Sequence, residues 1–181
     1  MRVGVFGGEF DPPHLGHLAV VRTARDQLGL DRLLVVPTGT PPHRAASATP
    51  ADARLRMAEL AFASEPRVEV SCMEVDRPGP SYTVDTLRAL GPEGELYLIL
   101  GADQVATLAG WHEPEQIQRL AHLVVAPRDG LDASARDITL LDMAPVDLSS
   151  TQVRELLEAG AGDPDVPAAV LGYIREHGLY A

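Results

Sequence analysis

Two histidines, His14 and His17, lie three residues apart in the segment GGEFDPPHLGH, directly after an apolar run. This spacing puts both imidazoles on one side of a helix that we expect to begin near Leu15. A helix N-terminus attracts anionic oxygens through its free N–H groups and its dipole, and imidazoles beside it can donate to phosphate. Either histidine alone fits a solvated side chain or one bonded to nearby backbone. The pair, directly after a strand and a glycine turn, favours a phosphate-binding site.

The glycines near these histidines bear on the same question. We expect the first strand to end at Phe6 and the chain to turn sharply at Gly7 and Gly8. Gly16 removes a side chain where phosphate would approach the backbone. The spacing of Gly4, Gly7 and Gly8 is not the G-x-G-x-x-G of a dinucleotide-binding fold, so it disfavours a dehydrogenase.

A second motif, DLSSTQVRELL, combines hydroxyls with a guanidinium at the start of another helix. Ser149 or Ser150 is expected to cap this helix, with Thr151 beside them and Arg154 one turn inside. Such a helix start is suited to clamp the β- and γ-phosphates of a nucleotide. The alternative is a capped amphipathic helix with a solvated Arg154. The histidine motif elsewhere in the chain favours the clamp.

Short apolar runs that alternate with helical patterns would position these motifs. Runs such as LYLIL and HLVVA have no polar alternate residues, which is typical of strands covered on both faces of a parallel sheet. The order of elements predicts an α/β fold with a doubly wound, mainly parallel sheet and C-terminal helices from about residue 149. The expected strands are 2–6, 32–37, 68–71, 96–100 and 122–126. The expected helices are 15–28, ending at Gly29, and 50–64, 82–90, 113–119, 150–159 and 167–176, with a surface loop at 127–136 and a turn at 160–167.

Ligands of such sheets bind beyond the carboxyl ends of the strands. The loops expected there, after the first, second and fourth strands, read GGEFDPPHLGH, PTGTPPHR and GADQ. These loops hold much of the glycine, proline and histidine of the chain. They are therefore where a binding site is expected.

Composition limits the class of protein. The 181 residues, 45% of them hydrophobic, suffice for one core, and we expect a single domain over 1–181. A net charge of −11 argues against a nucleic acid polymer as partner, because such binding depends on clustered basic side chains. All 15 basic residues are arginine, which excludes a lysine Schiff base and the lysine of a P-loop.

Location and cysteine content follow from the same composition. No apolar run approaches the roughly 20 residues that span a bilayer, so we expect a cytoplasmic protein without membrane association. Cys72 is the only cysteine, which leaves no disulfide and no cysteine cluster for zinc, and we expect it to be a small buried side chain. The sequence is compatible with a homo-oligomer but does not give its order.

The two motifs together carry a family resemblance. GGEFDPPHLGH and LSSTQVR resemble the signatures of the nucleotidyltransferases with an H-x-G-H motif and an S-[ST]-T-x-[IV]-R motif. Within that superfamily, PTGTPPHR, SYTVDTL, GADQ and the tryptophan of GWHEPEQI are similar to segments of the bacterial nicotinate mononucleotide adenylyltransferases. Two positions depart from the family: Glu9 replaces a small polar residue, and Arg44 replaces a lysine. Because a glutamate would repel phosphate, we expect Glu9 to point outward.

The resemblance implies a Rossmann-like nucleotidyltransferase fold and an activity. The adenylyl group of ATP would pass to nicotinate mononucleotide, giving nicotinate adenine dinucleotide and pyrophosphate in NAD biosynthesis. As catalytic residues it implies His17 at the α-phosphate, with His14 and Arg154 at the β and γ groups. Mg²⁺ that bridges the phosphates would be held by substrate and water, with no protein metal site. The other ATP-binding residues implied are Gly7, Gly8, Arg44, Gly101, Asp103, Ser149, Ser150 and Thr151.

For the pyridine nucleotide, the resemblance implies Gly8, Tyr82, Thr83 and Trp111. The indole would stack on the ring, and backbone amides near Thr83 would receive its carboxylate. Trp111 and Tyr82 could instead be core residues, and Asp103 could cap the next helix rather than bind a ribose hydroxyl.

Other functions stay open at this point. They are adenylyl transfer to nicotinamide mononucleotide or phosphopantetheine, and nucleotide sensing without turnover. Phosphopantetheine has no aromatic ring to stack on Trp111, and the set of His14, His17 and Arg154 disfavours a sensor. We expect nicotinate mononucleotide to be preferred over nicotinamide mononucleotide. The helix start near Thr83 offers only N–H donors, which suit a carboxylate and not the NH₂ of an amide.

Overall fold

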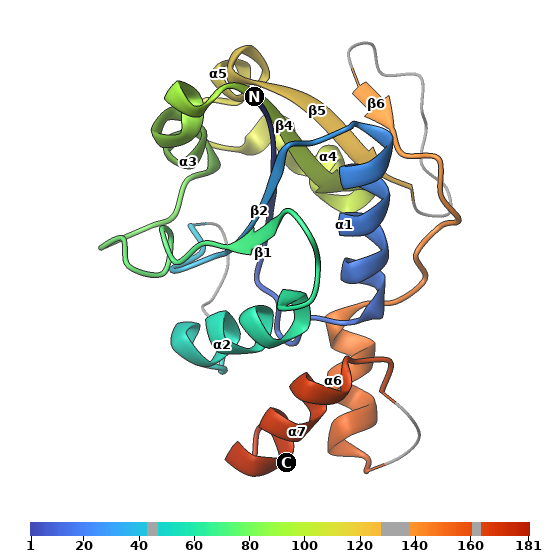
Figure 1. Cartoon of the computed structure of the whole chain (residues 1–181). Helices are drawn as coiled ribbons and strands as arrows, with labels where there is room; N and C mark the ends of the chain where they lie inside the picture. The colour runs from blue at the N-terminus through green and yellow to red at the C-terminus, as the bar shows by residue number, and fades with distance from the viewer. Residues whose placement is uncertain (43–46, 128–137, 161–163) are drawn as a thin grey trace.

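The chain forms one parallel sheet flanked by helices (Figure 1). The computed structural model describes residues 1–42, 47–127, 138–160 and 164–181. In these residues the six strands follow the order β3-β2-β1-β4-β5-β6, and every pair is parallel. This confirms the predicted doubly wound α/β fold.

The strands are β1 (Arg2–Gly8), β2 (Arg32–Pro37), β3 (Val68–Val70), β4 (Glu95–Gly101), β5 (Ala121–Ala126) and β6 (Ile138–Leu140). The helices are α1 (Leu15–Gln27), α2 (Ala51–Phe62), α3 (Thr83–Leu90), α4 (Ala102–Thr107), α5 (Pro114–Leu120), α6 (Ser150–Glu158) and α7 (Ala168–His177), with short 3₁₀ helices η1 (Gly91–Glu93) and η2 (Leu108–Gly110).

The strand order reverses at β1, which lies between β2 and β4. Val5 of β1 is in register with Leu34 of β2 and with Leu98 of β4. In a doubly wound sheet, the connections on the two sides of such a strand run over opposite faces and leave a crevice at its carboxyl end. The loops after β1 and β4 therefore border the expected ligand crevice.

Alternate residues of the central strands belong to two cores, one on each face of the sheet. Phe6 and Ile99 pack with residues of α1, α2, α6 and α7. Val5 and Leu98 pack with residues of α3 and α5. Burial on both faces is why the strands are continuous apolar runs.

Helices α6 and α7 lie beyond the carboxyl ends of the strands, below α1 in the view of Figure 1. Val153 of α6 and Val170 of α7 are fully buried in the core that includes α1 and α2. Ser150 Oγ donates to the carbonyl of Pro12 at 3.0 Å, which fastens the start of α6 to the loop after β1. The fold thus brings the two sequence motifs together.

Besides the two 3₁₀ helices, one strand and one α-helix were not predicted. β6 is a three-residue edge strand with Thr139 and Leu140 exposed, so no apolar run marks it. α4 begins at Ala102, directly after β4, in a segment expected to be a loop. The expected loop at 127–136 lies outside the described residues except for its first residue, and so do residues 161–163 of the expected turn.

The expected burial of Cys72 is wrong, because its side chain is exposed. The chain has already left the short strand β3 at this position. A hydrogen bond with Asp76 raises the pKa of the thiol. Among the described residues, no helix has both the length and the apolar character that crossing a membrane requires.

Candidate active site

A cavity of about 640 Å³ opens at the carboxyl ends of β1, β2 and β4. A cavity of this size can hold a nucleotide-sized ligand. Its walls come from β1, from the loop after β2, and from the α3 and α4–α5 segments. Of the predicted site residues it is lined by Gly7, Gly8, Tyr82, Thr83, Asp103 and Trp111.

The two histidines lie together at the start of α1. Their rings stack at a centroid distance of 3.7 Å. His14 is the N-cap of α1, and its backbone N–H donates to Nδ1 of His17 at 3.1 Å. Burial, and then the neighbouring His14, hold the pKa of His17 well below its ordinary value. His17 is therefore neutral near pH 7, and its proton resides on Nε2 because Nδ1 is an acceptor.

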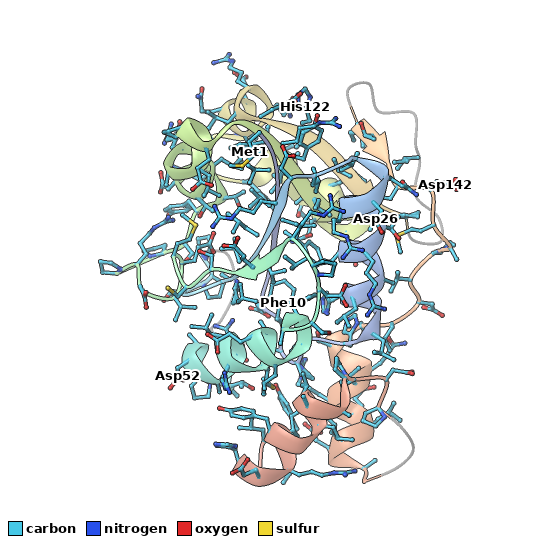
Figure 2. The ribbon with its side chains drawn as sticks, viewed as in Figure 1. Met1, Phe10, Asp26, Asp52, His122 and Asp142 are labelled. Atoms are coloured by element: carbon cyan, nitrogen blue, oxygen red, sulfur yellow. The ribbon has the colours of Figure 1, made fainter. Side chains whose placement is uncertain are left out.

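Phe10 makes the turn between β1 and these histidines. Its φ of 52° is in the left-handed region, which a bulky residue rarely adopts. The ring is held edge-on to Phe6, His17 and Phe62 at centroid distances of 5.5, 5.0 and 6.2 Å. Figure 2 shows Phe10 between α1 and α2. Aromatic packing thus holds the strained loop that carries the histidine motif.

The glycines act differently from their predicted roles. Gly7 and Gly8 belong to β1 and pair with Val36 and Pro37 of β2, so the predicted sharp turn at these glycines is wrong. Gly16 packs against the segment before α6: an added Cβ would lie 2.5 Å from Val146 Cγ1 and 3.0 Å from the His14 ring. Close packing accounts for Gly16 without a bound phosphate.

The start of α6 has the predicted cap. Ser149 is the N-cap, and its Oγ accepts from the N–H of Gln152 at 3.3 Å. The Arg154 guanidinium donates from Nη1 to the carbonyl of Asp11 at 2.7 Å and from Nη2 to Thr151 Oγ1 at 3.1 Å. With Ser150 bound to Pro12, these contacts bring α6 against the segment that leads to His14. Arg44 lies outside the described residues.

A buried arginine that the sequence analysis missed joins two of the loops. Arg54 of α2 is 3% exposed. Its guanidinium donates to the carbonyls of Glu9 at 2.8 Å, Gly39 at 3.2 Å and Thr49 at 3.3 Å. It therefore fixes the loop after β1 to the loop after β2. Its position among the apolar residues of α2 was the available signal, because a charge on a buried helical face must bond to something.

Aromatic rings line the side of the cavity near α3. The Trp111 indole N–H donates to Thr107 Oγ1 at 3.2 Å, and the side chain is half-buried between the cavity and the core. Tyr82, the N-cap of α3, lies with its ring 4.4 Å from that of His112. Tyr82 and Trp111 both contact the core and also line the cavity. The structure therefore combines the two interpretations of the sequence, as core residues and as residues of a binding site.

A buried carboxyl group, Glu74, also lines this cavity. The Thr86 hydroxyl donates to Glu74 Oε1 at 2.6 Å, and Arg77 donates to Thr86 at 3.4 Å. Burial raises the pKa of Glu74. Thr86 lies inside the SYTVDTL motif and could have been found from it, whereas Glu74 has no sequence signal of its own.

Gly101 and Asp103 begin α4. Gly101 is its N-cap, and the N–H of Gly101 donates to Gln104 Oε1 at 2.8 Å. Asp103 is the second residue of the helix and an exposed part of the cavity wall, so it is not the cap. Gln104, which the sequence analysis did not select, lines the cavity as well.

Among the described residues, there is no group of three or more histidine, cysteine, aspartate or glutamate side chains that could hold a metal ion. The donors near the loop after β1 are imidazoles, hydroxyls and a guanidinium. Such donors suit phosphate oxygens rather than a divalent cation.

The chain is similar to known proteins in sequence and in fold. A family model described as cytidylyltransferase-like matches residues 5–156. A Thermus thermophilus protein named "probable nicotinate-nucleotide adenylyltransferase" is 46% identical over 186 residues, covering 99% of this chain and 100% of that protein. A Dehalococcoides mccartyi protein of the same name is 41% identical over 198 residues, covering 99% of this chain and 97% of that protein.

A solved structure shares the fold. The Plasmodium falciparum nicotinic acid mononucleotide adenylyltransferase complexed with NaAD superposes with a TM-score of 0.80. The superposition covers 99% of this chain and 97% of that chain, at 16% sequence identity. At this identity the likeness concerns the fold alone.

Proposed function

Because this chain belongs to the cytidylyltransferase-like family, and within it to the nicotinate-nucleotide adenylyltransferases, we propose that it transfers the adenylyl group of ATP to nicotinate mononucleotide. The products are nicotinate adenine dinucleotide and pyrophosphate. The observation that carries the proposal is the full-length similarity to relatives of that name, together with a nucleotide-sized cavity lined by Gly7 and Gly8 of the segment that leads to the histidines. A cytoplasmic location is part of the proposal.

The reaction needs alignment and charge stabilisation more than proton transfer. The nucleophile is a phosphate oxygen of the mononucleotide, which is already anionic at neutral pH. It attacks the α-phosphorus of ATP in line with the departing pyrophosphate. The protein must therefore hold both phosphates and stabilise the charge that develops on the leaving group.

His17 of the histidine motif supplies a neutral donor for this task. With Nδ1 of His17 accepting from the backbone, Nε2–H is left to donate to the α-phosphate. His14, which caps the same helix, would serve the β and γ groups together with Arg154. The guanidinium carries five N–H groups and uses two in its bonds to Asp11 and Thr151, so donors remain for a phosphate.

The cavity suits the pyridine end of the acceptor. Trp111 offers an indole held by Thr107, and Tyr82 and Thr83 begin a helix whose first N–H groups have no intrahelical acceptor. These features support stacking of the ring and binding of its carboxylate. They do not suit phosphopantetheine, which has no ring.

Mg²⁺ belongs to the proposal as a partner of ATP. Bound to the phosphates, it would neutralise the charge that builds up on the departing pyrophosphate. The imidazoles and the guanidinium beside the loop would then contact phosphate oxygens and not the ion.

Incubation with ATP, magnesium and one acceptor at a time, followed by identification of the products, tests the proposal. The acceptors are nicotinate mononucleotide, nicotinamide mononucleotide and phosphopantetheine. Formation of nicotinate adenine dinucleotide with equimolar pyrophosphate is expected. Tight nucleotide binding without any product would instead identify a sensor.

A further inference from the structure

Asp11 lies at the centre of a buried hydrogen-bond group in the loop after β1. Its side chain is 8% exposed, and both carboxylate oxygens accept a hydroxyl. Ser47 Oγ donates to Oδ2 at 2.5 Å, and Tyr180 Oη donates to Oδ1. The donors come from the segment before α2 and from the segment after α7, so one carboxylate joins three separate parts of the chain.

The same residue holds Arg154. Its carbonyl accepts from Arg154 Nη1 at 2.7 Å, and its Oδ2 is 3.7 Å from the same nitrogen. The orientation of the Arg154 guanidinium therefore depends on where Asp11 is held. His14 follows three residues later, so a shift of Asp11 would displace both phosphate-binding groups.

The backbone after α7 directs Tyr180 to Asp11. Gly178 is in the left-handed conformation with φ of 60°, and the N–H of Leu179 donates to the carbonyl of Ile174 at 3.0 Å. This is the hydrogen-bond pattern that turns a chain back at the end of a helix. Burial, and then the bond to Asp11, raise the pKa of Tyr180, so the phenol keeps its proton and stays a donor.

We propose that Tyr180 is a positioning residue for adenylyl transfer: its hydroxyl fixes the Asp11 carboxylate, and through Asp11 it sets the Arg154 guanidinium and the histidine loop for the phosphates of ATP. The inference rests on the proposed function, because it assigns ATP to Arg154. It adds a part of the chain, beyond α7, that neither motif includes.

The test is Tyr180→Phe, which keeps the ring and removes only the hydroxyl. The expected result is a KM for ATP raised about tenfold, the scale for one lost bond to a buried charged group, while the KM for the mononucleotide is unchanged. Tyr173→Phe is the matched control, because Tyr173 stacks on His177 in α7 and has no hydroxyl contact to the loop in the described structure. It should behave as wild type at a temperature where all variants are folded.

A double-mutant cycle separates positioning from general destabilisation. If the hydroxyl acts through Asp11, adding Tyr180→Phe to Asp11→Ala, which leaves no side-chain acceptor, should lower kcat/KM for ATP by clearly less than it does in the wild type. Equal effects in both backgrounds, or an unchanged KM for ATP in Tyr180→Phe, would overturn the inference. If the wild type makes no dinucleotide, the proposed function fails. The role of Tyr180 is then decided by calorimetry with a non-hydrolysable ATP analogue, which measures how much Tyr180→Phe weakens binding in the wild type and in the Asp11 variant.

Discussion

The backbone N–H of His14 donates to Nδ1 of His17, three residues further along α1. This contact has the form of a helix capping box in which an imidazole replaces the usual glutamate or glutamine. It gives His17 two roles, because one ring nitrogen stabilises the helix start while the other is free of that bond and can face a substrate. The two roles can be separated by mutation.

His17→Glu should remove the second role and keep the first, since a carboxylate oxygen at this position can accept from the His14 N–H but has no N–H to donate to phosphate. We expect a melting temperature close to wild type and turnover lower by about 10²-fold or more, the scale for a lost charge-stabilising donor. His17→Ala should lose the same activity and also about 1 kcal/mol of stability with the cap. Steady-state kinetics and thermal melts measure both. Near-normal turnover in a folded His17→Glu would remove His17 from the mechanism.

Stability should depend on pH through the same ring. The folded protein keeps His17 neutral, whereas in the unfolded chain its pKa is about 6.5. Below that pH the unfolded state binds the additional proton, so the free energy of unfolding falls as pH decreases toward the lowered pKa of the folded state. Above pH 7 this contribution is constant. Denaturant unfolding of wild type and His17→Gln from pH 5 to 8 should show a stability difference that changes only below about 6.5. If the free energy of unfolding of the two proteins changed with pH in parallel, the lowered pKa of His17 in the folded state would be contradicted.

Gly16→Ala distinguishes two reasons for a glycine at this position. One is close packing against Val146, and the other is room for a phosphate to approach the backbone. The added methyl would lie 2.5 Å from Val146 Cγ1, so the structure predicts a loss of about 1 to 3 kcal/mol through overpacking. Adding Val146→Ala should restore part of that loss, although Val146→Ala alone destabilises. A fully stable Gly16→Ala with a raised KM for ATP would instead support the prediction from the sequence that Gly16 leaves room for phosphate.

Much of the sheet was predictable from the sequence, because strands buried on both faces must be apolar throughout. The central strands β2 and β5 were located within one residue, whereas the exposed edge strand β6 carries no such pattern. The predicted binding loops converge because the carboxyl ends of parallel strands meet at one edge. His14, His17 and Arg154 were selected from motifs, and the fold brings all three to the loop after β1.

What the sequence could not supply was the set of residues that hold those motifs. Arg54, Asp11 and Tyr180 act through bonds to segments far away in the chain, and no local spacing reveals such partners. Gly7 and Gly8 show the opposite failure. Glycine is typical of turns, but here the turn is made by Phe10, whose strained backbone is held by aromatic packing.

Arg154→Ala should chiefly weaken the use of ATP. It removes a positive charge next to the loop proposed to bind phosphate, together with the bond to the Asp11 carbonyl. We expect the KM for ATP to rise by about tenfold or more, with a smaller change for the mononucleotide. Arg119→Ala, which removes an exposed arginine of α5 paired only with Glu115 among the described residues, is the control and should leave both values unchanged. A loss confined to the mononucleotide would reverse the assignment of the two ends of the site.

Nicotinate mononucleotide should be preferred over nicotinamide mononucleotide. The two acceptors differ only in a carboxylate against a carboxamide, so a site made of donors distinguishes them, because the NH₂ of the amide would face N–H groups that lose their acceptors. The cavity wall at Thr83 begins α3, where such N–H groups and the positive end of the helix dipole favour an anion. Two mismatched groups at about 1 to 3 kcal/mol each give roughly 10²-fold or greater discrimination in kcat/KM.

Thr107→Ala provides the matched control for this preference. It removes the acceptor of the Trp111 indole N–H and so loosens a ring expected to stack on the pyridine. Stacking does not distinguish acid from amide, so kcat/KM should fall for both mononucleotides by a similar factor and leave their ratio unchanged. The preference is tested by measuring kcat/KM for both mononucleotides in the wild type and in Thr107→Ala. Equal values for acid and amide in the wild type would disprove the proposed donor site at α3, and adenylyl transfer itself would still stand.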